Sequence, residues 1–385
     1  MCAAYRGKTG VATDINPFLV WLASAKARSY DAKAISTFEH AAQLAATGAS
    51  DARSPLAHSP PLANIARWWR PSALSFLCRL KAAIAAHHTG DATLLNVAFC
   101  RTMMKLSNAA FNHQSMSFRE PPVVGVPAGA AGADETESFA AQFLGDASQI
   151  AAAAADNPAG TAEYILSNAR GGAGVTGGAG VHAGAGVAAG TGVRGGSESG
   201  GDSAASVAKW LGRVDLLITS PPYPNRMSYI RELRPYMYWL QYLATGRQAG
   251  ELDWEAIGGT WGVATSRLAD WAPCGEFVPS GMERVLAKIR AAHGRNGPLL
   301  ANYVHKYFED MFAHFTAMLP LLKSGATVHY IVGNSIFYGH MVHAEDYLAQ
   351  QMAAVGLRDV RIVPIRKRNS KRGLVEFHVA GTRRT

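Results

Sequence analysis

Cysteine and long apolar runs are scarce in this 385-residue chain, and each scarcity excludes a class of protein. The four cysteines form no Cys-x-x-Cys pair and no spacing typical of a disulfide framework, so we expect reduced thiols and a cytoplasmic location. No apolar stretch approaches the ~20 residues that a membrane-spanning helix needs, which excludes a membrane partner. The cysteines are Cys2, Cys78, Cys100 and Cys274.

Metal-ligating clusters are also missing from the sequence. His340 and His343 lie three residues apart, but no third ligand follows at a suitable spacing. We therefore predict surface histidines and no metal site.

Acidic residues are fewer than basic ones, 28 against 37, which gives a formal net charge of +9. An excess of Lys and Arg attracts polyanions such as nucleic acid. Many soluble proteins are mildly basic without binding nucleic acid, so the charge alone does not decide between these two interpretations.

Two segments are too biased in composition to form a packed core. Residues 121–135 are rich in Pro, Gly and Ala and read as a linker, and residues 171–202 repeat Gly-Ala-Gly-Val. Gly, Ala and Ser cannot offset the entropy of their ordering, so we predict that residues 171–202 are a disordered insertion. Its Gly-x-Gly strings do not predict a cofactor loop, because no hydrophobic strand precedes them and no helix follows.

Elsewhere, apolar runs alternate with segments of helical periodicity, which predicts an α/β fold: a doubly wound sheet that ends in an antiparallel hairpin. Asn16 and Pro17 predict the start of a helix, since Asn is a good cap and Pro is tolerated at the first helical position. The expected strands cover residues 11–13, 162–166, 214–218, 326–332, 360–365 and 374–380. The expected helices cover residues 72–86, 92–108, 135–156, 230–243, 303–322 and 343–355, after the helix that opens at Pro17.

The most informative feature is the run Val214-Asp215-Leu216-Leu217-Ile218 and the Thr219-Ser220-Pro221-Pro222-Tyr223 turn that follows it. A continuous apolar run predicts a central strand that is covered on both faces, and ligands bind beyond the carboxyl ends of such strands. The two prolines remove two backbone donors and leave only carbonyl acceptors. Together with the Ser220 hydroxyl and the Tyr223 ring, this turn suits a flat group that carries an NH2.

Ser-Pro-Pro-Tyr after a hydrophobic strand resembles the catalytic motif of the amino-methyltransferases of DNA. These enzymes methylate cytosine N4 or adenine N6 from S-adenosyl-L-methionine, and a serine in the first position is more typical of the cytosine-N4 members. The resemblance extends to residues 224–232, Val332-Gly333-Asn334-Ser335 and 366–371, and Asp14-Ile15-Asn16-Pro17-Phe18 resembles the second cofactor strand. It covers about half the chain and implies a Rossmann-like methyltransferase fold.

The resemblance implies a role for each residue of the turn. The Ser220 hydroxyl and the Pro221 carbonyl would accept the two amine hydrogens and localise the nitrogen lone pair for direct attack on the methyl group. Pro222 would stiffen the turn. Tyr223 would stack on the flipped base, which returns about 1–3 kcal/mol against a flipping cost of a few kcal/mol. A plain loop turn is the alternative for these four residues.

The resemblance also implies the residues that bind the cofactor and the DNA. Asp14, Asn16 and Asn168 would bind S-adenosyl-L-methionine, with Asp14 on the ribose and Asn168 near the adenine, although a strand-ending Asn is also an ordinary turn former. The cations at 366–372 would clamp phosphates of double-stranded DNA or form a solvated turn, and Arg231 has the same two readings. The predicted DNA-binding residues are Arg231, Arg366, Lys367, Arg368 and Lys371.

The family's Gly-rich first strand has no counterpart in the sequence. We therefore expect this polypeptide alone to bind the cofactor poorly, and a separate polypeptide or an upstream reading frame to supply that strand.

The expected organisation is a truncated N-terminal part of the methyltransferase core at 1–34, a helical insertion at 35–120, a linker, helix, strand and Gly-rich tract at 121–206, and a catalytic core at 207–385. Residues 245–300 are expected to be an irregular insertion. The helical insertion reads equally as a DNA target-recognition element or as a packed cap.

Three other functions remain open. A cytosine-C5 methyltransferase needs a cysteine nucleophile, but Cys274 lies away from any expected strand end. An RNA or protein-glutamine amino-methyltransferase would use a similar turn. An inactive fragment that binds DNA through its basic hairpin is the non-enzymatic alternative.

Overall fold

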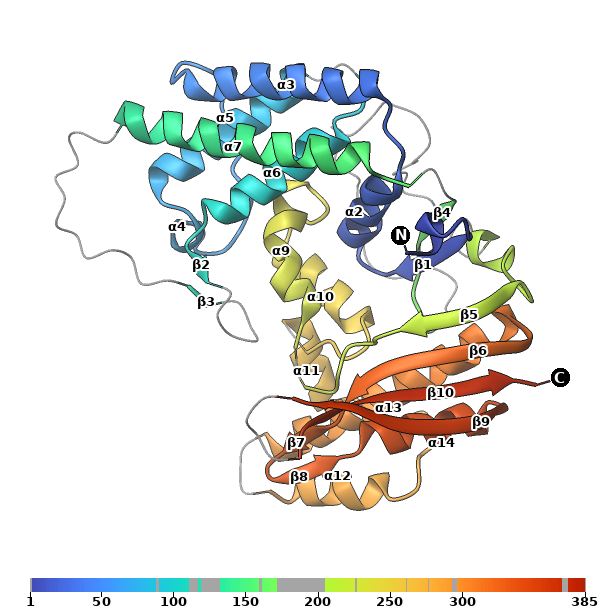
Figure 1. Ribbon diagram of the computed structural model, residues 1–385. Coiled ribbons are helices and arrows are strands. Elements are labelled where there is room, and N and C mark those ends of the chain that lie inside the picture. Colours follow the sequence, from blue (N-terminus) through green and yellow to red (C-terminus); the bar gives the residue numbers. More distant parts are fainter. Residues whose placement is uncertain are drawn as a thin grey trace.

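The computed structural model describes residues 2–87, 90–110, 117–118, 132–158, 161–171, 205–225, 227–260, 262–275, 277–292, 296–368 and 373–384. The described chain is a mixed α/β structure in which a layer of helices lies beside several small sheets (Figure 1). The predicted disordered insertion at 171–202 lies outside the described residues apart from Gly171, and the predicted linker lies outside them up to residue 131. None of the described helices combines the length and the hydropathy that crossing a bilayer requires.

The N-terminal unit is a two-stranded parallel sheet with its connecting helix. After α1 (Cys2–Tyr5), β1 (Gly10–Asp14) pairs with β4 (Ala162–Leu166) in register from Gly10↔Ala162 to Asp14↔Leu166. Helix α2 (Pro17–Ala27) begins where predicted, because the Asn16 side chain accepts a hydrogen bond from the Phe18 amide at 3.0 Å. The small sheet therefore joins segments about 150 residues apart in the chain.

Five helices form a separate layer that buries alanines and aromatic rings. They are α3 (Ala32–Ser50), α4 (Ile65–Trp68), α5 (Pro71–His87), α6 (Thr93–Lys105) and α7 (Gly132–Ala155). Alanines at helical spacing on α3, from Ala41 to Ala49, let the neighbouring helices approach closely. The predicted helical block is thus confirmed, and the Ala-rich helix α7 packs against it (Figure 1). A short antiparallel pair, β2 (Ala109–Ala110) and β3 (Ser117–Phe118), follows α6.

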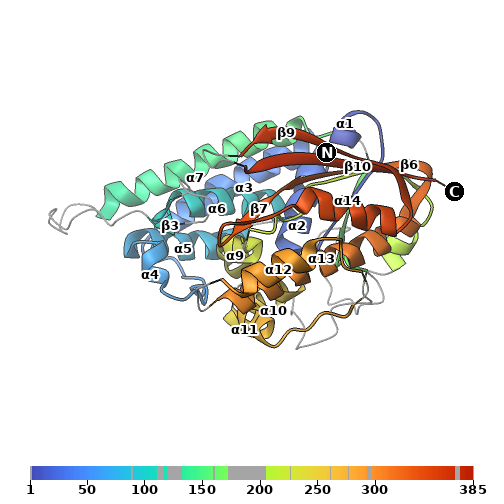
Figure 2. The same ribbon diagram turned by 90° about the horizontal axis from the view of Figure 1, so that it is seen from below.

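The C-terminal half is built on a four-stranded sheet in the order β5-β6-β10-β9. Strands β5 (Val214–Thr219) and β6 (Leu322–Gly333) are parallel, and β10 (Val375–Arg383) is antiparallel to both β6 and β9 (Leu357–Lys367). Helices α13 (Gly297–Met318) and α14 (Ala344–Ala354) cover one face, where Val328, Tyr330 and Val332 are fully buried. Figure 2 shows these helices beneath the sheet. A turn of 3-10 helix (Leu319–Leu321) and the hairpin β7 (Ser335–Phe337) and β8 (His340–Val342) complete this half.

The prediction that residues 214–218 form a central strand covered on both faces is wrong. Among the described strands β5 pairs with β6 alone, so it is an edge strand. Leu216 and Ile218 point away from α13 and are 51% and 69% exposed, whereas Leu217 packs against the core. The apolar run identified a strand correctly, but run length does not report which of its edges and faces are covered.

The prediction of an irregular insertion at 245–300 is also wrong, because three helices occupy much of it. They are α10 (Gly246–Glu255), α11 (Val263–Ala269) and α12 (Met282–Arg290). A reciprocal capping box between Thr245 and Gln248 starts α10, and α12 buries Met282, Leu286 and Ile289. Preceding them, α9 (Tyr229–Trp239) matches the helix predicted over 230–243 and is capped by Ser228.

Trp69 is a direct test of the helical layer. Its ring is fully buried, packs edge-on against Trp239 of α9, and donates its indole N–H to the Met103 carbonyl at 2.9 Å. We expect Trp69→Ala to lower the free energy of unfolding by about 3–5 kcal/mol in urea titrations. Leu44→Ala, at a position 38% exposed, should change it by less than about 0.5 kcal/mol, and equal effects of the two substitutions would contradict this packing.

Candidate functional site

The predicted catalytic turn lies at the carboxyl end of β5, on the side of the sheet where β6 also ends. Ser220 is exposed, Pro221 is buried, and Pro222 and Tyr223 are half-buried. The Ser220 hydroxyl donates a hydrogen bond to the Ile331 carbonyl at 3.1 Å, because the parallel pairing of β5 with β6 brings the two residues together. The Ser220 hydroxyl also lies close enough to the Tyr223 hydroxyl to lower the pKa of that phenol, although burial raises it more.

The Tyr223 side chain is contacted at its hydroxyl and over the face of its ring. Its hydroxyl donates to Glu376 Oε1 at 3.1 Å, and the Arg368 guanidinium lies over its ring, 4.8 Å from the centroid. Gly333 makes this arrangement possible, since a Cβ at that position would lie 2.4 Å from Arg368 Nη1 and 3.0 Å from the Tyr223 ring. The ring is therefore fixed in orientation before any ligand binds.

Hydrogen bonds join the end of β6 to the β9–β10 hairpin. Asn334 Nδ2 donates to the Gly373 carbonyl, Asn334 Oδ1 accepts from the Val375 amide, and the Asn334 carbonyl accepts from Arg368 Nη1, each at 2.9 Å. Asn334 is buried, so these bonds satisfy its polar groups. The hairpin is thereby anchored beside the turn that carries Ser220.

Glu376 is a site residue that the sequence analysis missed. It accepts hydrogen bonds from Tyr223 and from Arg366, and the bond from Arg366 is the main reason that its pKa lies below the ordinary value. Burial raises the pKa of Tyr223, which keeps its hydroxyl protonated as a donor. The expected hairpin could have revealed Glu376, since an antiparallel register places it opposite Arg366.

The three predicted cofactor residues lie together at the end of the small sheet. The Ser167 amide donates to the Asp14 carbonyl at 3.0 Å, which continues the β1–β4 ladder and brings Asn168 beside Asp14. Asp14 Oδ1 accepts from the Asn16 amide at 2.7 Å, and burial raises the pKa of the Asp14 carboxyl. Asn16 itself is 2% exposed and caps α2, so it stabilises the helix start rather than facing solvent.

Asn168 is occupied by protein contacts. Its Oδ1 accepts from the Arg170 amide at 3.0 Å and its Nδ2 lies 3.3 Å from Glu255 Oε2. Arg170 in turn binds Asp310 of α13 at 2.9 Å and pairs with Glu255. The turn-forming role considered for Asn168 is therefore present in the structure.

Helix α10 connects the cofactor candidates to the catalytic turn. Glu255 at its end contacts Asn168, and Asp253 accepts a hydrogen bond from the Ser228 hydroxyl at 2.5 Å. Gly258 follows α10 and lies against Pro222, where an added Cβ would be 3.6 Å from the proline Cβ. Helix α10 and the residues that follow it therefore contact Asn168 at one end and Pro222 at the other.

The predicted DNA-binding cations divide into three groups. Arg231 and Lys367 are exposed. Arg368 covers the Tyr223 ring, and Arg366 pairs with Glu376 while its own side chain stays 72% exposed. Lys371 lies outside the described residues.

One group of side chains on α14 has the composition of a metal site. Ligand atoms of His343, Glu345 and Asp346 lie within 4.8 Å of one another at the start of the helix, and His343 Nδ1 is 3.0 Å from Glu345 Oε1. Acidic residues in a first helical turn are also stabilised by the helix dipole, which accounts for their position without an ion.

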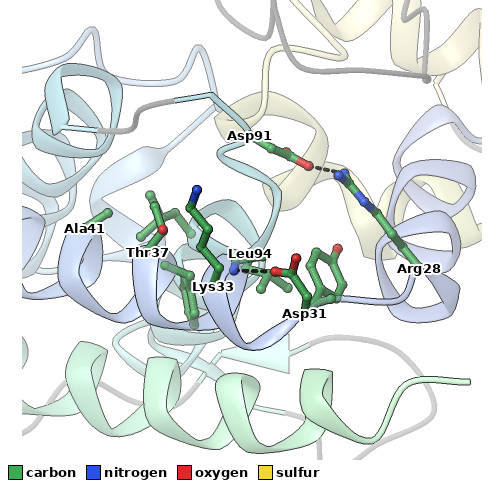
Figure 3. Close-up of a pocket in the computed structure, with 11 residues that line it drawn as sticks. Arg28, Asp31, Lys33, Thr37, Ala41, Asp91 and Leu94 are labelled. Atoms are coloured by element: carbon green, nitrogen blue, oxygen red, sulfur yellow. Dashed lines mark hydrogen bonds and ion pairs between the residues drawn. The ribbon is translucent and has the colours of Figure 1, made fainter. Parts of the chain in front are cut away.

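A cavity of about 260 Å³ lies in the helical layer, between the end of α2 and helices α3 and α6 (Figure 3). The Arg28–Asp91 ion pair closes one side, and Asp31 and Lys33 line it with both signs of charge. None of the predicted site residues that the structure describes lines this cavity.

No family model matches the chain, and neither the curated proteins nor the solved structures compared with it show a match.

Glu376 should make the stability of the protein depend on pH. Since its folded pKa is lowered, its contribution is present above the ordinary carboxyl value of 4.5 and is lost as the pH falls through the folded pKa. Between about pH 6 and about pH 3.5, the free energy of unfolding in urea should fall more for the parent than for Glu376→Gln. Exposed Glu137→Gln is the control, and it should behave like the parent; parallel losses in Glu376→Gln and the parent would contradict the role of this carboxylate.

Proposed function

We propose that this protein is a methyltransferase that transfers a methyl group from S-adenosyl-L-methionine to the exocyclic amine of a base in double-stranded DNA, cytosine N4 rather than adenine N6. The observation that carries the proposal is the turn Ser220–Tyr223, with an exposed hydroxyl, two prolines and a ring fixed by Arg368 and Glu376. The turn lies at a strand's carboxyl end, the usual ligand side of an α/β sheet.

The strand arrangement supports a Rossmann-like interpretation of the fold. The order β4-β1 in one sheet and β5-β6-β10-β9 in the other, with β10 the antiparallel strand, is what a doubly wound sheet shows when one strand between β1 and β5 is removed. In Figure 1, β1 lies between β4 and β5. The two small sheets would then be parts of one.

The Ser220 oxygen and the Pro221 carbonyl would accept the two hydrogens of the base amine and localise its lone pair on nitrogen. The amine nitrogen would form the new bond to the methyl carbon, the electron pair of the broken carbon–sulfur bond would remain on sulfur as the leaving group, and the amine would then release one proton to solvent. Because Ser220 donates its own proton to the Ile331 carbonyl, its oxygen is oriented as an acceptor. The fixed ring of Tyr223 offers a stacking surface for the base.

S-adenosyl-L-methionine, when bound, supplies an electrophilic methyl group. The residues present fit its adenosine end in part: Asp14 offers a half-buried carboxylate for ribose hydroxyls, whereas the amide of Asn168 is already hydrogen-bonded within the protein. Asn16 leaves its buried Nδ2 without a partner among the described residues, which is a polar group that a ligand beside Asp14 could satisfy.

The free strand edges support a separate polypeptide as partner. Among the described strands, β1 pairs only with β4 and β5 only with β6, so each presents unpaired backbone groups along one edge. Leu216 and Ile218 expose aliphatic surface at the β5 edge, and Val11 does so on β1. A strand added between them would bond to both edges and cover these side chains.

Cofactor binding tests the partner directly. We expect titration calorimetry of this chain alone to show no micromolar binding of S-adenosyl-L-methionine, because the described strands include no Gly-rich strand between β1 and β5 whose backbone donors could hold the cofactor. Micromolar binding by the chain alone would contradict the need for an added strand while leaving the catalytic proposal intact.

Ser220→Ala tests the catalytic turn. We expect tritiated methyl transfer to duplex DNA, assayed with the strand-supplying polypeptide added, to fall at least about 100-fold, since one acceptor at the reacting amine is lost, while DNA affinity stays within about twofold. Ser72→Ala, at an exposed position on α5, is the control and should leave transfer unchanged. Full transfer by Ser220→Ala would exclude this mechanism.

Two outcomes of the same assay favour other functions. Preferential transfer to RNA would identify an RNA amino-methyltransferase. No transfer by the parent chain, with or without a strand-supplying partner, combined with retained DNA affinity would favour an inactive DNA-binding fragment.

A further inference from the structure

Arg67, Arg231 and Arg234 lie where α9 meets the helical layer, around the buried Trp68 ring and the half-buried Phe118 ring. The Arg67 guanidinium lies over the Phe118 ring, 4.4 Å from its centroid, and the Arg234 guanidinium lies over the Trp68 ring at 5.0 Å. Trp68 and Phe118 meet edge to face at 4.9 Å. The rings therefore hold the Arg67 and Arg234 guanidinium groups in place. These side chains would lose less conformational entropy when an anion binds than arginines that have no such support.

The positive charges in this surface repel one another. Burial and then the neighbouring charge of Arg231 lower the pKa of Arg234, while the nearby carboxylate of Glu232 partly opposes them. Nearby Arg70 has a carboxylate partner in Glu135, whereas neither Arg67 nor Arg231 has an ion-pair partner within the part of the chain that the structure describes. Concentrated like charge at a half-buried position is stabilised when an anion binds there.

The surface continues directly from the catalytic turn. Helix α9 begins at Tyr229, and a rise of about 1.5 Å per residue places Arg231 and Arg234 within about 8 Å of that point along the helix. Figures 1 and 2 both show α4 and β3 on the same side of α9. About two phosphates of one DNA strand would span this length of α9, since each strand carries one phosphate per about 3.4 Å.

We propose that Arg67, Arg231 and Arg234 bind phosphates of duplex DNA beside the target base, so that the helical layer is part of the DNA-binding surface rather than only a packed cap. This assignment rests on the proposed function. Guanidinium groups that are pre-positioned on aromatic rings suit phosphate oxygens, to which they donate in pairs.

The test is fluorescence anisotropy of the full chain with a labelled duplex of about 30 base pairs, titrated at several salt concentrations. We expect the double variant Arg67→Gln, Arg231→Gln to bind at least tenfold more weakly at low salt. The slope of log affinity against log salt should decrease by about 2, one phosphate contact for each cation removed. Arg234 is left in place because its stacking on Trp68 supports the fold.

The matched control is Arg53→Gln, Arg384→Gln, which removes the same charge from exposed arginines paired with Asp51 and Asp359. It should reduce affinity less than threefold, and thermal unfolding by circular dichroism should be alike for all three proteins. Equal weakening in both double variants, or parent-like affinity of Arg67→Gln, Arg231→Gln, would overturn this surface and leave the proposed function standing. A parent chain that does not bind duplex DNA would overturn both, and tighter binding of single-stranded RNA would reassign the surface to RNA.

Discussion

The parallel pairing of β5 with β6 is the constraint on which the site depends. Its register sets Thr219 opposite Tyr330, so the residue that follows, Ser220, meets the carbonyl of Ile331. Tyr223 then lies above Gly333, at the last position of β6, where only hydrogen leaves room for Arg368. Because β10 pairs with the other edge of β6, Glu376 comes within reach of the Tyr223 hydroxyl. A shift of one residue in this register would turn these side chains to the opposite face.

The segment that begins with the Ser220–Tyr223 turn also joins two separate hydrophobic cores. One core contains the helical layer and α9, where Phe18 stacks on Tyr236 at 4.8 Å; the other contains α13, α14 and the covered face of the four-stranded sheet. Residues 220–228 run from the second core to the first. Packing of α9 in the first core therefore fixes where Arg231 and Arg234 lie, and packing of β5 against the second core fixes where Ser220 lies.

Much of the element order could be predicted because local patterns determine it. The strand at Ala162–Leu166 and the start of α2 at Pro17 follow from apolar runs and from the capping of Asn16. Helices α10 to α12 were missed, although Thr245 and Gln248 form a capping box, because Trp and Gly residues around them dilute the helical periodicity. The site was predictable only where it is contiguous in sequence, as at Ser220–Tyr223.

The sequence by itself determined the strand at 214–219, the start of α2 and several other elements, and it placed a hydroxyl, two prolines and an aromatic ring directly after a strand. Tertiary structure decided what those residues contact. The contacts of Tyr223 with Glu376 and of Arg368 with Asn334, and the stacked pairs Arg67–Phe118 and Arg234–Trp68, join residues 34 to 166 positions apart in the chain. No local sequence pattern encodes contacts over such separations. The exposed edge of β5 was likewise decided by strand pairing, since hydrophobicity records a preference for burial and not whether a neighbouring strand is present.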